Sequence, residues 1–435
     1  MNEEISYTEF HHIDLSREMQ PLAMKANAST LFIIFWWKSL PLGQYFTRRP
    51  PLFLSKPAIR EIAEKVTLPA TEEYLTLLPI HDSGRQDSVT FRDRLALLDK
   101  IVDDNAQSAG FSDVNISLVI PTCGRVESLR KNLSSLAMLE IQPNEIIVVD
   151  NAPSSNPFSS AGIQDLQEEF PNVRFIREVT PGASAARNRG AYESSGEIIA
   201  FLDDDELVHP SWLTQLCAGF RDPRVGVVTG IVFPTLLTTY AQGLFEERFS
   251  FIKGYHCRDF GQHFFEANRW WGMPVWEIGG SGNMAIRREL FNTIDGFDER
   301  LGSGRAGCSE DTELFYRVIR SGWTCRYEPR AICYHNHRFE MAGLKQQLFG
   351  YMRGHITALL IQFAKWRDVG NLFRLFLWLP LVYLKYFMRG LMLHSAFAPE
   401  ILMTEVAGCL SGVKFYWQNR ERPKKAIRNV LLDHS

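Results

Sequence analysis

The feature that most constrains the fold is an alternation of short apolar strands and amphipathic helices in the middle of the chain. Runs rich in β-branched residues lie at 116–120, 145–149, 173–176 and 197–202, and helical spacing appears between them, as at 125–138. Strands that alternate with helices predict right-handed βαβ units and a parallel sheet. Ligands of such sheets bind beyond the carboxyl ends of the strands. Polar residues that follow the strands are therefore expected to share one crevice.

Polar residues do follow three of these strands. They are Thr122 and Arg125 after the first, next to Pro121, then Asp150 at the end of the second, and Asp203, Asp204 and Asp205 after the fourth. Buried unpaired carboxylates are very costly, and clustered carboxylates repel one another unless a cation lies between them. Their hard oxygens suit Mg²⁺ or Mn²⁺, which in turn suit a diphosphate. The alternative interpretation is a solvated acidic turn before a helix near Ser211.

Three further segments have the composition of a binding site. Residues 181–191 begin a helix with small residues, which lets a ligand approach the backbone closely. Residues 279–283 are Gly-Gly-Ser-Gly-Asn, which is typical of a tight site or of a simple turn. Glu310 and Asp311 begin another helix, where acidic residues are also favoured by the helix dipole alone.

Taken in order, these segments resemble the inverting family 2 glycosyltransferases of the GT-A fold, in a bacterial form with an extra N-terminal module. The resemblance covers residues 114–340. It implies an α/β, Rossmann-like domain and a metal-dependent enzyme of the hexosyltransferase type. Such an enzyme moves a sugar from a nucleotide-diphosphate donor to a hydroxyl of a glycan or lipid-linked acceptor, in glycan or glycolipid biosynthesis. The implied cofactor is Mn²⁺ or Mg²⁺.

The resemblance also implies a role for each motif residue. The residues implied in nucleotide binding are Pro121, Thr122, Arg125, Asp150, Arg187, Asp203 and Asp204. The implied metal ligands are Asp205, Asp203 and His335; His337, which shares a strand face with His335, is nearly as suitable, and a packed histidine is the alternative. Asp311 is the implied catalytic base, positioned by Glu310, and such a base typically contributes about 10²–10⁴-fold in rate. Donor sugar and acceptor are expected near Gly280, Ser281, Gly282 and Asn283.

The chain departs from the processive members of that family. Those enzymes carry a Gln-x-x-Arg-Trp motif after the base, together with long membrane helices. Here Arg269-Trp270 precedes the base and lacks the glutamine. The longest uncharged stretch within the apolar segment 372–393 is 375–384, which is about half of the roughly 20 residues that a spanning helix needs. We therefore expect single additions, with Trp270, Trp271 and Trp276 either stacking on an acceptor or packing in the core.

We expect three parts: a β-rich accessory module at 1–113 that ends in a polar linker at 103–113, the GT-A domain at 114–340, and a helical region at 341–435. Residues 372–428 alternate between apolar and basic, which fits either contact with a membrane surface or a soluble helical cap. The acidic N-terminus is not a signal peptide, and the seven cysteines have no regular spacing. These features predict a cytoplasmic protein, peripheral at the inner face of the membrane if 372–428 binds lipid.

The residues alone leave two other functions open. Nucleic-acid binding is not one of them, because a net charge of −3 gives no electrostatic reason to expect it. A nucleotidyltransferase has a similar fold, but the loop after the first strand here, Pro-Thr-Cys-Gly-Arg, lacks the expected glycine run and lysine. A non-catalytic sugar-binding protein would not need Asp203, Asp205 and Asp311, all of which are present.

Overall fold

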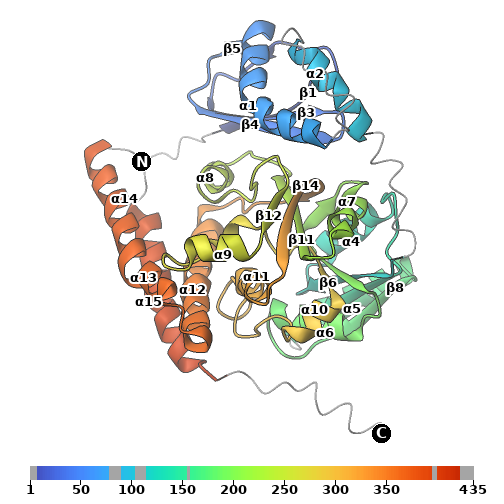
Figure 1. Cartoon of the computed structure of the whole chain (residues 1–435), viewed down its shortest axis with the longest axis vertical. Helices are drawn as coiled ribbons and strands as arrows, with labels where there is room; N and C mark the ends of the chain where they lie inside the picture. Colours follow the sequence, from blue (N-terminus) through green and yellow to red (C-terminus); the bar gives the residue numbers. More distant parts are fainter. Residues whose placement is uncertain (1–6, 78–89, 103–113, 154–156, 394–398, 422–435) are drawn as a thin grey trace.

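The computed structural model describes residues 7–77, 90–102, 114–153, 157–393 and 399–421. A small N-terminal part lies at one end of a larger α/β part, and the C-terminal helices cover one side of the larger part (Figure 1). The linker predicted at 103–113 lies outside the described residues, and the domain boundaries at 113 and 340 stay predictions.

The larger part is built around a nine-stranded sheet with the order β10-β14-β11-β13-β9-β6-β7-β8, in which β12 also pairs with β14. Its strands are β6 Ile116–Thr122, β7 Glu145–Asp150, β8 Val173–Arg177, β9 Ile198–Leu202, β10 Glu206–Val208, β11 Val225–Pro234, β12 Arg258–Phe260, β13 Asn283–Arg287 and β14 Thr324–His335. The strands β9, β6, β7 and β8 are parallel, whereas β13 runs antiparallel to β9 and β11. The predicted α/β fold class with a Rossmann-like sheet is confirmed.

Helices cover both faces of this sheet. They are α4 Val126–Leu136, α5 Pro157–Glu169, α6 Ala183–Glu193, α7 Trp212–Ala218, α8 Tyr240–Phe249, α9 Gln262–Asn268, α10 Arg288–Thr293 and α11 Glu310–Arg320, with short helical turns η2 Gly219–Arg221 and η3 Val275–Glu277. Successive strand residues point to opposite faces, so Leu118 packs with α4 and α7 while Val119 packs with α6 and α11. Gly190 brings α6 close to the sheet, because a Cβ there would lie 2.3 Å from a methyl carbon of Val119.

The N-terminal part contains its own sheet, with the order β1-β3-β4. Its elements are β1 Tyr7–Asp14, β2 Leu22–Ala23, β3 Ala28–Trp37, β4 Leu40–Arg48, β5 Phe53–Leu54, α1 Lys56–Thr76 and α2 Phe91–Leu97. One face of β3, with Leu31, Ile33 and Phe35, packs beneath α1. The other face, with Phe32, Ile34 and Trp36, joins the core of the larger part.

The C-terminal region is helical, as predicted. Its elements are α12 Met341–Trp366, α13 Val369–Phe373, the π-helical turn η4 Arg374–Trp378, α14 Leu379–Leu393 and α15 Pro399–Gln418. The helices α12 and α15 approach closely at Gly408 and Gly412, where a Cβ would lie 2.6 and 2.7 Å from carbonyl oxygens of α12. Among the described helices, none combines the length and the apolar character needed to cross a bilayer.

Candidate active site

The carboxyl ends of β6, β7 and β9 lie side by side, as the sequence predicts. Thr122 pairs with Asp150 across the parallel ladder, and Pro121 pairs with Val149. The hydroxyl of Thr122 donates to a carboxylate oxygen of Asp204 at 2.6 Å, which ties the end of β6 to the residues after β9. Asp150 is buried, forms an ion pair with Arg177 and accepts the amide of Ala152 at 3.0 Å.

The three consecutive aspartates have three different environments. Asp204 is fully buried and pairs with Thr122 and Arg125; burial raises its pKa to about 7, although Arg125 opposes that rise. Asp203 accepts from the guanidinium of Arg187 at 2.6 Å. Asp205 forms an ion pair with Arg125, and its Oδ2 lies 4.0 Å from Nε2 of His335. The middle aspartate therefore fixes the loop, while its two neighbours carry the more accessible carboxylates.

A chain of hydrogen bonds leads from His335 into the interior. Its Nδ1 lies 2.8 Å from Nδ1 of His337, whose Nε2 lies 2.6 Å from the buried carboxylate of Glu246 on α8. A carboxylate only accepts, so Nε2–H of His337 donates to Glu246. In the arrangement in which Nδ1–H of His335 donates to Nδ1 of His337, the lone pair of His335 Nε2 faces Asp205. Burial lowers the pKa of His335 to about 4, so that this ring is neutral at pH 7.

The helix α11 begins with Glu310 and Asp311, which lie beside Arg187 and Ser281. Glu310 accepts from Arg187 at 2.9 Å and from the hydroxyl of Ser281 at 3.4 Å. Asp311 accepts the backbone amides of Thr312 at 2.7 Å and Ser281 at 3.3 Å. Burial, and after it the neighbouring Glu310, raises the pKa of Asp311 to about 7. A carboxylate with such a pKa is suited to exchange protons near neutral pH.

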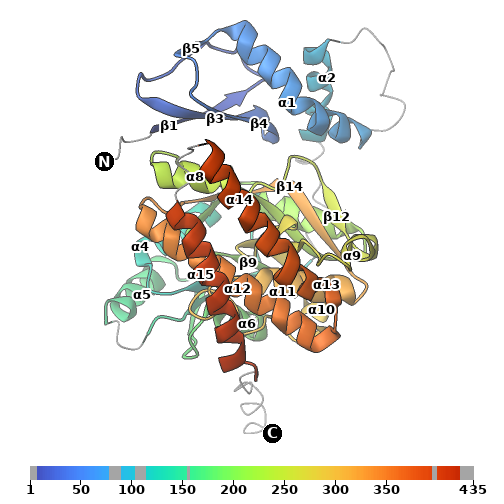
Figure 2. The ribbon, with the colours of Figure 1, turned by 90° about the vertical axis from the view of Figure 1, so that its left-hand side faces the viewer.

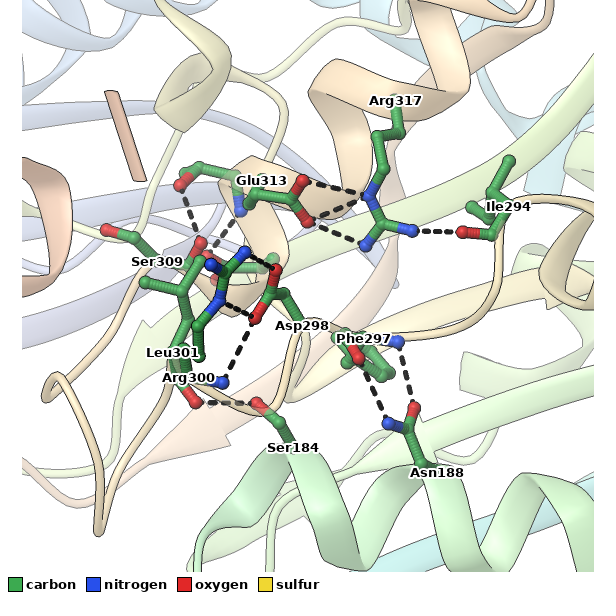
Figure 3. Close-up of polar contacts among 12 residues, drawn as sticks. Ser184, Asn188, Ile294, Phe297, Asp298, Arg300, Leu301, Ser309, Glu313 and Arg317 are labelled. Carbon is green, nitrogen blue, oxygen red and sulfur yellow. Dashed lines mark hydrogen bonds and ion pairs between the residues drawn. The ribbon is translucent and has the colours of Figure 1, made fainter. Parts of the chain in front are cut away.

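Buried polar contacts hold the loop that precedes α11 (Figure 3). The side-chain amide of Asn188 on α6 bonds both backbone groups of Phe297, at 2.8 and 3.0 Å, and the hydroxyl of Ser184 donates to the carbonyl of Leu301 at 2.8 Å. Ser309, directly before Glu310, has a left-handed backbone with φ 70°. Non-glycine residues adopt that conformation only when their surroundings enforce it. The loop thus fixes the start of α11 and, with it, the orientation of Glu310 and Asp311.

Arg187 joins the two halves of the site. Its side chain is buried, and its guanidinium contacts Asp203 on one side and Glu310 on the other. The positive charge of Arg187 offsets two carboxylates that would otherwise repel each other. The first aspartate after β9 and the first acid of α11 consequently lie on the same guanidinium.

The glycine segment borders these acids, with one exception. A Cβ at Gly282 would lie 2.6 Å from Glu206 and 2.9 Å from Asp203, and one at Gly280 would lie 3.6 Å from Asp311. Asn283 instead points into the core, where it accepts from the indole of Trp212 at 2.8 Å and donates to two backbone carbonyls at 3.0 Å. The side chain of Asn283 therefore holds β13 against the neighbouring elements.

The tryptophans before this segment lie toward the C-terminal helices. Trp276 lies under the guanidinium of Arg374 at 4.6 Å, and Trp271 packs edge-on against Phe373 at 4.8 Å. Trp270 and Trp271 are exposed.

Within the described ranges, no three His, Cys, Asp or Glu side chains gather as a ready-made metal-binding group. Asp205 and His335 form a pair, with Oδ2 and Nε2 4.0 Å apart. Asp203 faces Arg187 in this structure.

The sequence interpretation missed two residues of the site. Glu246 orients the histidine pair but lies on α8, far along the chain from His335, and no motif marks it. Arg177, at the end of β8, pairs with Asp150. A signal for Arg177 existed, because a residue at the carboxyl end of the neighbouring parallel strand is expected at the same edge.

Comparisons with known proteins show what this chain is similar to. Residues 117–294 match the family model for glycosyl transferase family 2. The chain is 29% identical over 263 residues to the pre-mycofactocin glycosyltransferase of Mycobacterium tuberculosis, which covers 59% of this chain and 50% of that protein. It is 27% identical over 263 residues to the succinoglycan biosynthesis protein ExoM of Rhizobium meliloti, covering 56% of this chain and 76% of that protein.

Among solved structures, the mannosyltransferase PcManGT from Pyrobaculum calidifontis, in complex with GDP-Man and Mn²⁺, has a TM-score of 0.44 at 14% identity, covering 73% of this chain and 96% of that chain. The chain spans about half the length of its Mycobacterium relative. The matched range contains the strand-end residues and the glycine segment but ends before Glu310, Asp311 and His335.

Proposed function

We propose that this chain transfers a sugar from a nucleotide-diphosphate donor to an acceptor hydroxyl with inversion, which is supported by the match of residues 117–294 to the family model for glycosyl transferase family 2. The observation that carries the proposal is the Arg187 bridge, which brings Asp203 and Glu310 to one guanidinium. Donor-binding carboxylates and a candidate base thereby share one crevice. We propose a single-addition, hexosyltransferase-type enzyme of glycan or glycolipid biosynthesis.

The donor nucleotide is assigned to the edge formed by β6, β7 and β9. Asp150 and Thr122 lie at adjacent strand ends, where a base and ribose can contact carboxylate and hydroxyl groups. Arg125 is positioned to contact phosphate oxygens once they draw it away from Asp204 and Asp205. Asp203 is assigned to the ribose side, held by Arg187. Asp204 acts indirectly, because its carboxylate is occupied by Thr122 and Arg125.

Asp205 and His335 fit a divalent cation that arrives with the diphosphate. The lone pair of His335 Nε2 and the Asp205 oxygen are two acceptors 4.0 Å apart, and two ligands of one cation lie about 3–4 Å from each other. Mg²⁺ commonly takes one or two protein ligands and completes its shell with phosphates and water. Mn²⁺ or Mg²⁺ at this position would neutralise charge on the departing diphosphate. His337 and Glu246 hold the histidine in the required tautomer.

Asp311 is assigned as the base. It would accept the proton of the acceptor hydroxyl while that oxygen attacks the anomeric carbon and the bond to the diphosphate breaks. A single displacement of this kind inverts the configuration and needs no covalent intermediate. The half-buried carboxylate, whose pKa is raised to about 7 by burial and by Glu310, supports this role. Gly280, Ser281 and Gly282 provide backbone beside the reacting groups, with the Ser281 amide orienting Asp311.

We further propose a cytoplasmic enzyme that is peripheral at the inner face of a membrane, through residues 372–428. The parts of that range at 394–398 and 422–428 lie outside the described residues.

Product analysis tests the proposed function. The chain is incubated with Mn²⁺ and a panel of nucleotide-diphosphate sugars, and slow hydrolysis of the matching donor is followed by the release of its nucleoside diphosphate. Release of that product by the wild type, with loss of release in Asp205→Ala, supports a glycosyltransferase. A second incubation supplies nucleoside triphosphates with sugar 1-phosphates, and release of pyrophosphate there would identify a nucleotidyltransferase. Binding of a donor without turnover in either incubation would identify a sugar-binding protein.

A further inference from the structure

The C-terminal helices carry exposed apolar side chains on their outer side. We call this set the apolar face; its residues are Phe376, Leu377, Trp378, Leu381, Leu384, Phe387 and Met388 along η4 and α14, and Met403, Val406, Leu410 and Trp417 along α15. Along η4 and α14, positions 377, 381, 384 and 388 repeat at helical spacing and form one stripe. Positions 403, 406, 410 and 417 form a second stripe on α15. Both helices lie outermost on this side of the molecule (Figure 2).

The inner sides of the same helices pack against the rest of the protein, so the apolar face is not needed to form the core. Ile401 is buried beside α8 and α12, and Leu379 is buried against α12. By contrast, Leu381 and Leu384 are each 55% exposed, and Met403 and Leu410 are each 70% exposed. Large contiguous patches of this kind usually mark a surface that is covered in use. The helical-cap interpretation of this region therefore accounts for the inner residues but not for the outer ones.

Charge identifies what covers the apolar face. Between positions 369 and 428 the sequence holds nine Lys and Arg but three Asp and Glu, whereas the whole chain holds 47 against 50. Glu405, one of the three acids, is buried and paired with Arg248 at 2.7 Å, and Arg374, one of the nine basic residues, is buried as well. Lys385 and Lys414 are exposed and lie within the two stripes. The region is thus positive as well as apolar, while the rest of the chain is negative.

We propose that the apolar face lies on an anionic lipid surface, with α14 and α15 in the interfacial plane. Apolar side chains beside Lys and Arg are the composition of helices that bind at the boundary of headgroups and acyl chains. Anionic lipid attracts each basic residue near its surface. A second copy of this chain is a poorer partner, because a symmetric contact would bring like charges together. The proposal extends the location given under the proposed function by naming the surface and its lipid chemistry.

The apolar face also adjoins the active-site segment. Trp271 contacts Phe373 directly before η4, and a Cβ at Gly370 would lie 2.1 Å from the carbonyl oxygen of Arg269. From there the chain continues past Trp276, which lies under Arg374, to the Ser281 amide that binds Asp311. A lipid surface on the apolar face would therefore lie against one end of the segment that holds the candidate base.

Vesicle flotation with the full chain tests the proposal. Vesicles of equal parts phosphatidylglycerol and phosphatidylcholine are compared with vesicles of phosphatidylcholine alone. The wild type is expected to float with the anionic vesicles and to be released by salt. Lys385→Gln and Lys414→Gln should each lower the partition coefficient about fivefold. The pair Leu381→Glu with Leu384→Glu should lower it on the order of tenfold or more. Met138→Glu, at an exposed residue after α4, is the matched control and should bind like the wild type.

Three results would overturn this inference. The first is a wild type that stays with the unbound fraction, and the second is a double Leu→Glu variant that floats like the wild type. The third is a stable dimer by light scattering that the same double variant dissociates, which would assign the face to a second copy. Circular dichroism checks that the variants are folded. Donor hydrolysis without vesicles is measured in parallel: hydrolysis without flotation refutes only the lipid surface, and flotation without hydrolysis refutes only the proposed function.

Discussion

Replacing Asp311 with asparagine separates catalysis from stability at one position. The side chains have nearly the same shape, so the substitution keeps the packing of α11 while removing the proton acceptor. Asp311 accepts two backbone amides, one on each carboxylate oxygen. Asparagine offers one carbonyl oxygen, which can keep the 2.7 Å bond from Thr312 and lose the longer one from Ser281. The expected change in transfer rate is a loss of about 10²–10⁴-fold, the usual contribution of a general base.

The same variant should be more stable than the wild type above neutral pH. Burial raises the pKa of Asp311 from 3.8 to about 7, so the folded state binds more protons than the unfolded state between these values. Stability therefore falls as pH rises through that window and stays lower above it. Three pKa units correspond to at most about 4 kcal/mol. Loss of the hydrogen bond from Ser281 costs the variant about 1 kcal/mol or more. Part of the cost of charging Asp311 also comes from its repulsion with Glu310. We therefore expect the variant to gain about 2 kcal/mol of stability at pH 8.

Initial rates with the matching donor and thermal unfolding at pH 5 and pH 8 measure both effects. The variant should bind donor and Mn²⁺ like the wild type, transfer sugar far more slowly, and unfold a few degrees higher at pH 8 but not at pH 5. Near-normal turnover would refute the base assignment. Slow turnover together with lower stability at pH 8 would refute the argument that the charge on Asp311 is disfavoured in the folded state.

Three further predictions concern acidity, the metal site and packing. The wild-type kcat/KM should fall about tenfold per pH unit below pH 7, as Asp311 becomes protonated, and a profile flat to pH 5 would contradict this. Glu246→Gln should weaken Mn²⁺ binding about 10–100-fold in a titration followed by paramagnetic resonance, because His335 loses its fixed tautomer, whereas the surface control Glu247→Gln should bind normally. Gly190→Ala should destabilise the protein by about 1–3 kcal/mol in denaturant unfolding, since its Cβ would lie 2.3 Å from a Val119 methyl; unchanged stability would mean that α6 can shift away.

The strands of the central sheet were predictable because their signal is local. Each of β6, β7, β8 and β9 is a short β-branched run, and the parallel arrangement follows from the helices between them. The antiparallel insertion of β13 between β9 and β11 was not predictable in this way. Its partners lie far from it in the sequence, and no property of residues 283–287 selects them.

The residues of the candidate site also fall into those that a local sequence signal predicts and those that depend on contacts between distant parts of the chain. Residues directly after strands, such as Thr122 and Asp203, were located by the rule for strand ends. The individual functions of the aspartates depend on three-dimensional partners, so that only the structure pairs Asp204 with Thr122 and turns Asp203 toward Arg187. Asn283 shows the opposite limit: a residue within a functional motif can direct its side chain entirely into the core. The metal and base assignments stay predictions.

The N-terminal sheet has a consequence for how this chain can be divided. Trp36 of β3 packs on Phe233 of β11 with ring centroids 5.2 Å apart, and Tyr255 donates to Gln44 of β4 at 2.8 Å. Removal of the residues before position 114 would take the N-terminal sheet away from the larger part. The aromatic rings of Phe233 and Tyr255 would then be exposed to water. Truncated proteins that lack the N-terminal sheet are therefore expected to aggregate unless the exposed aromatic residues are replaced by polar ones.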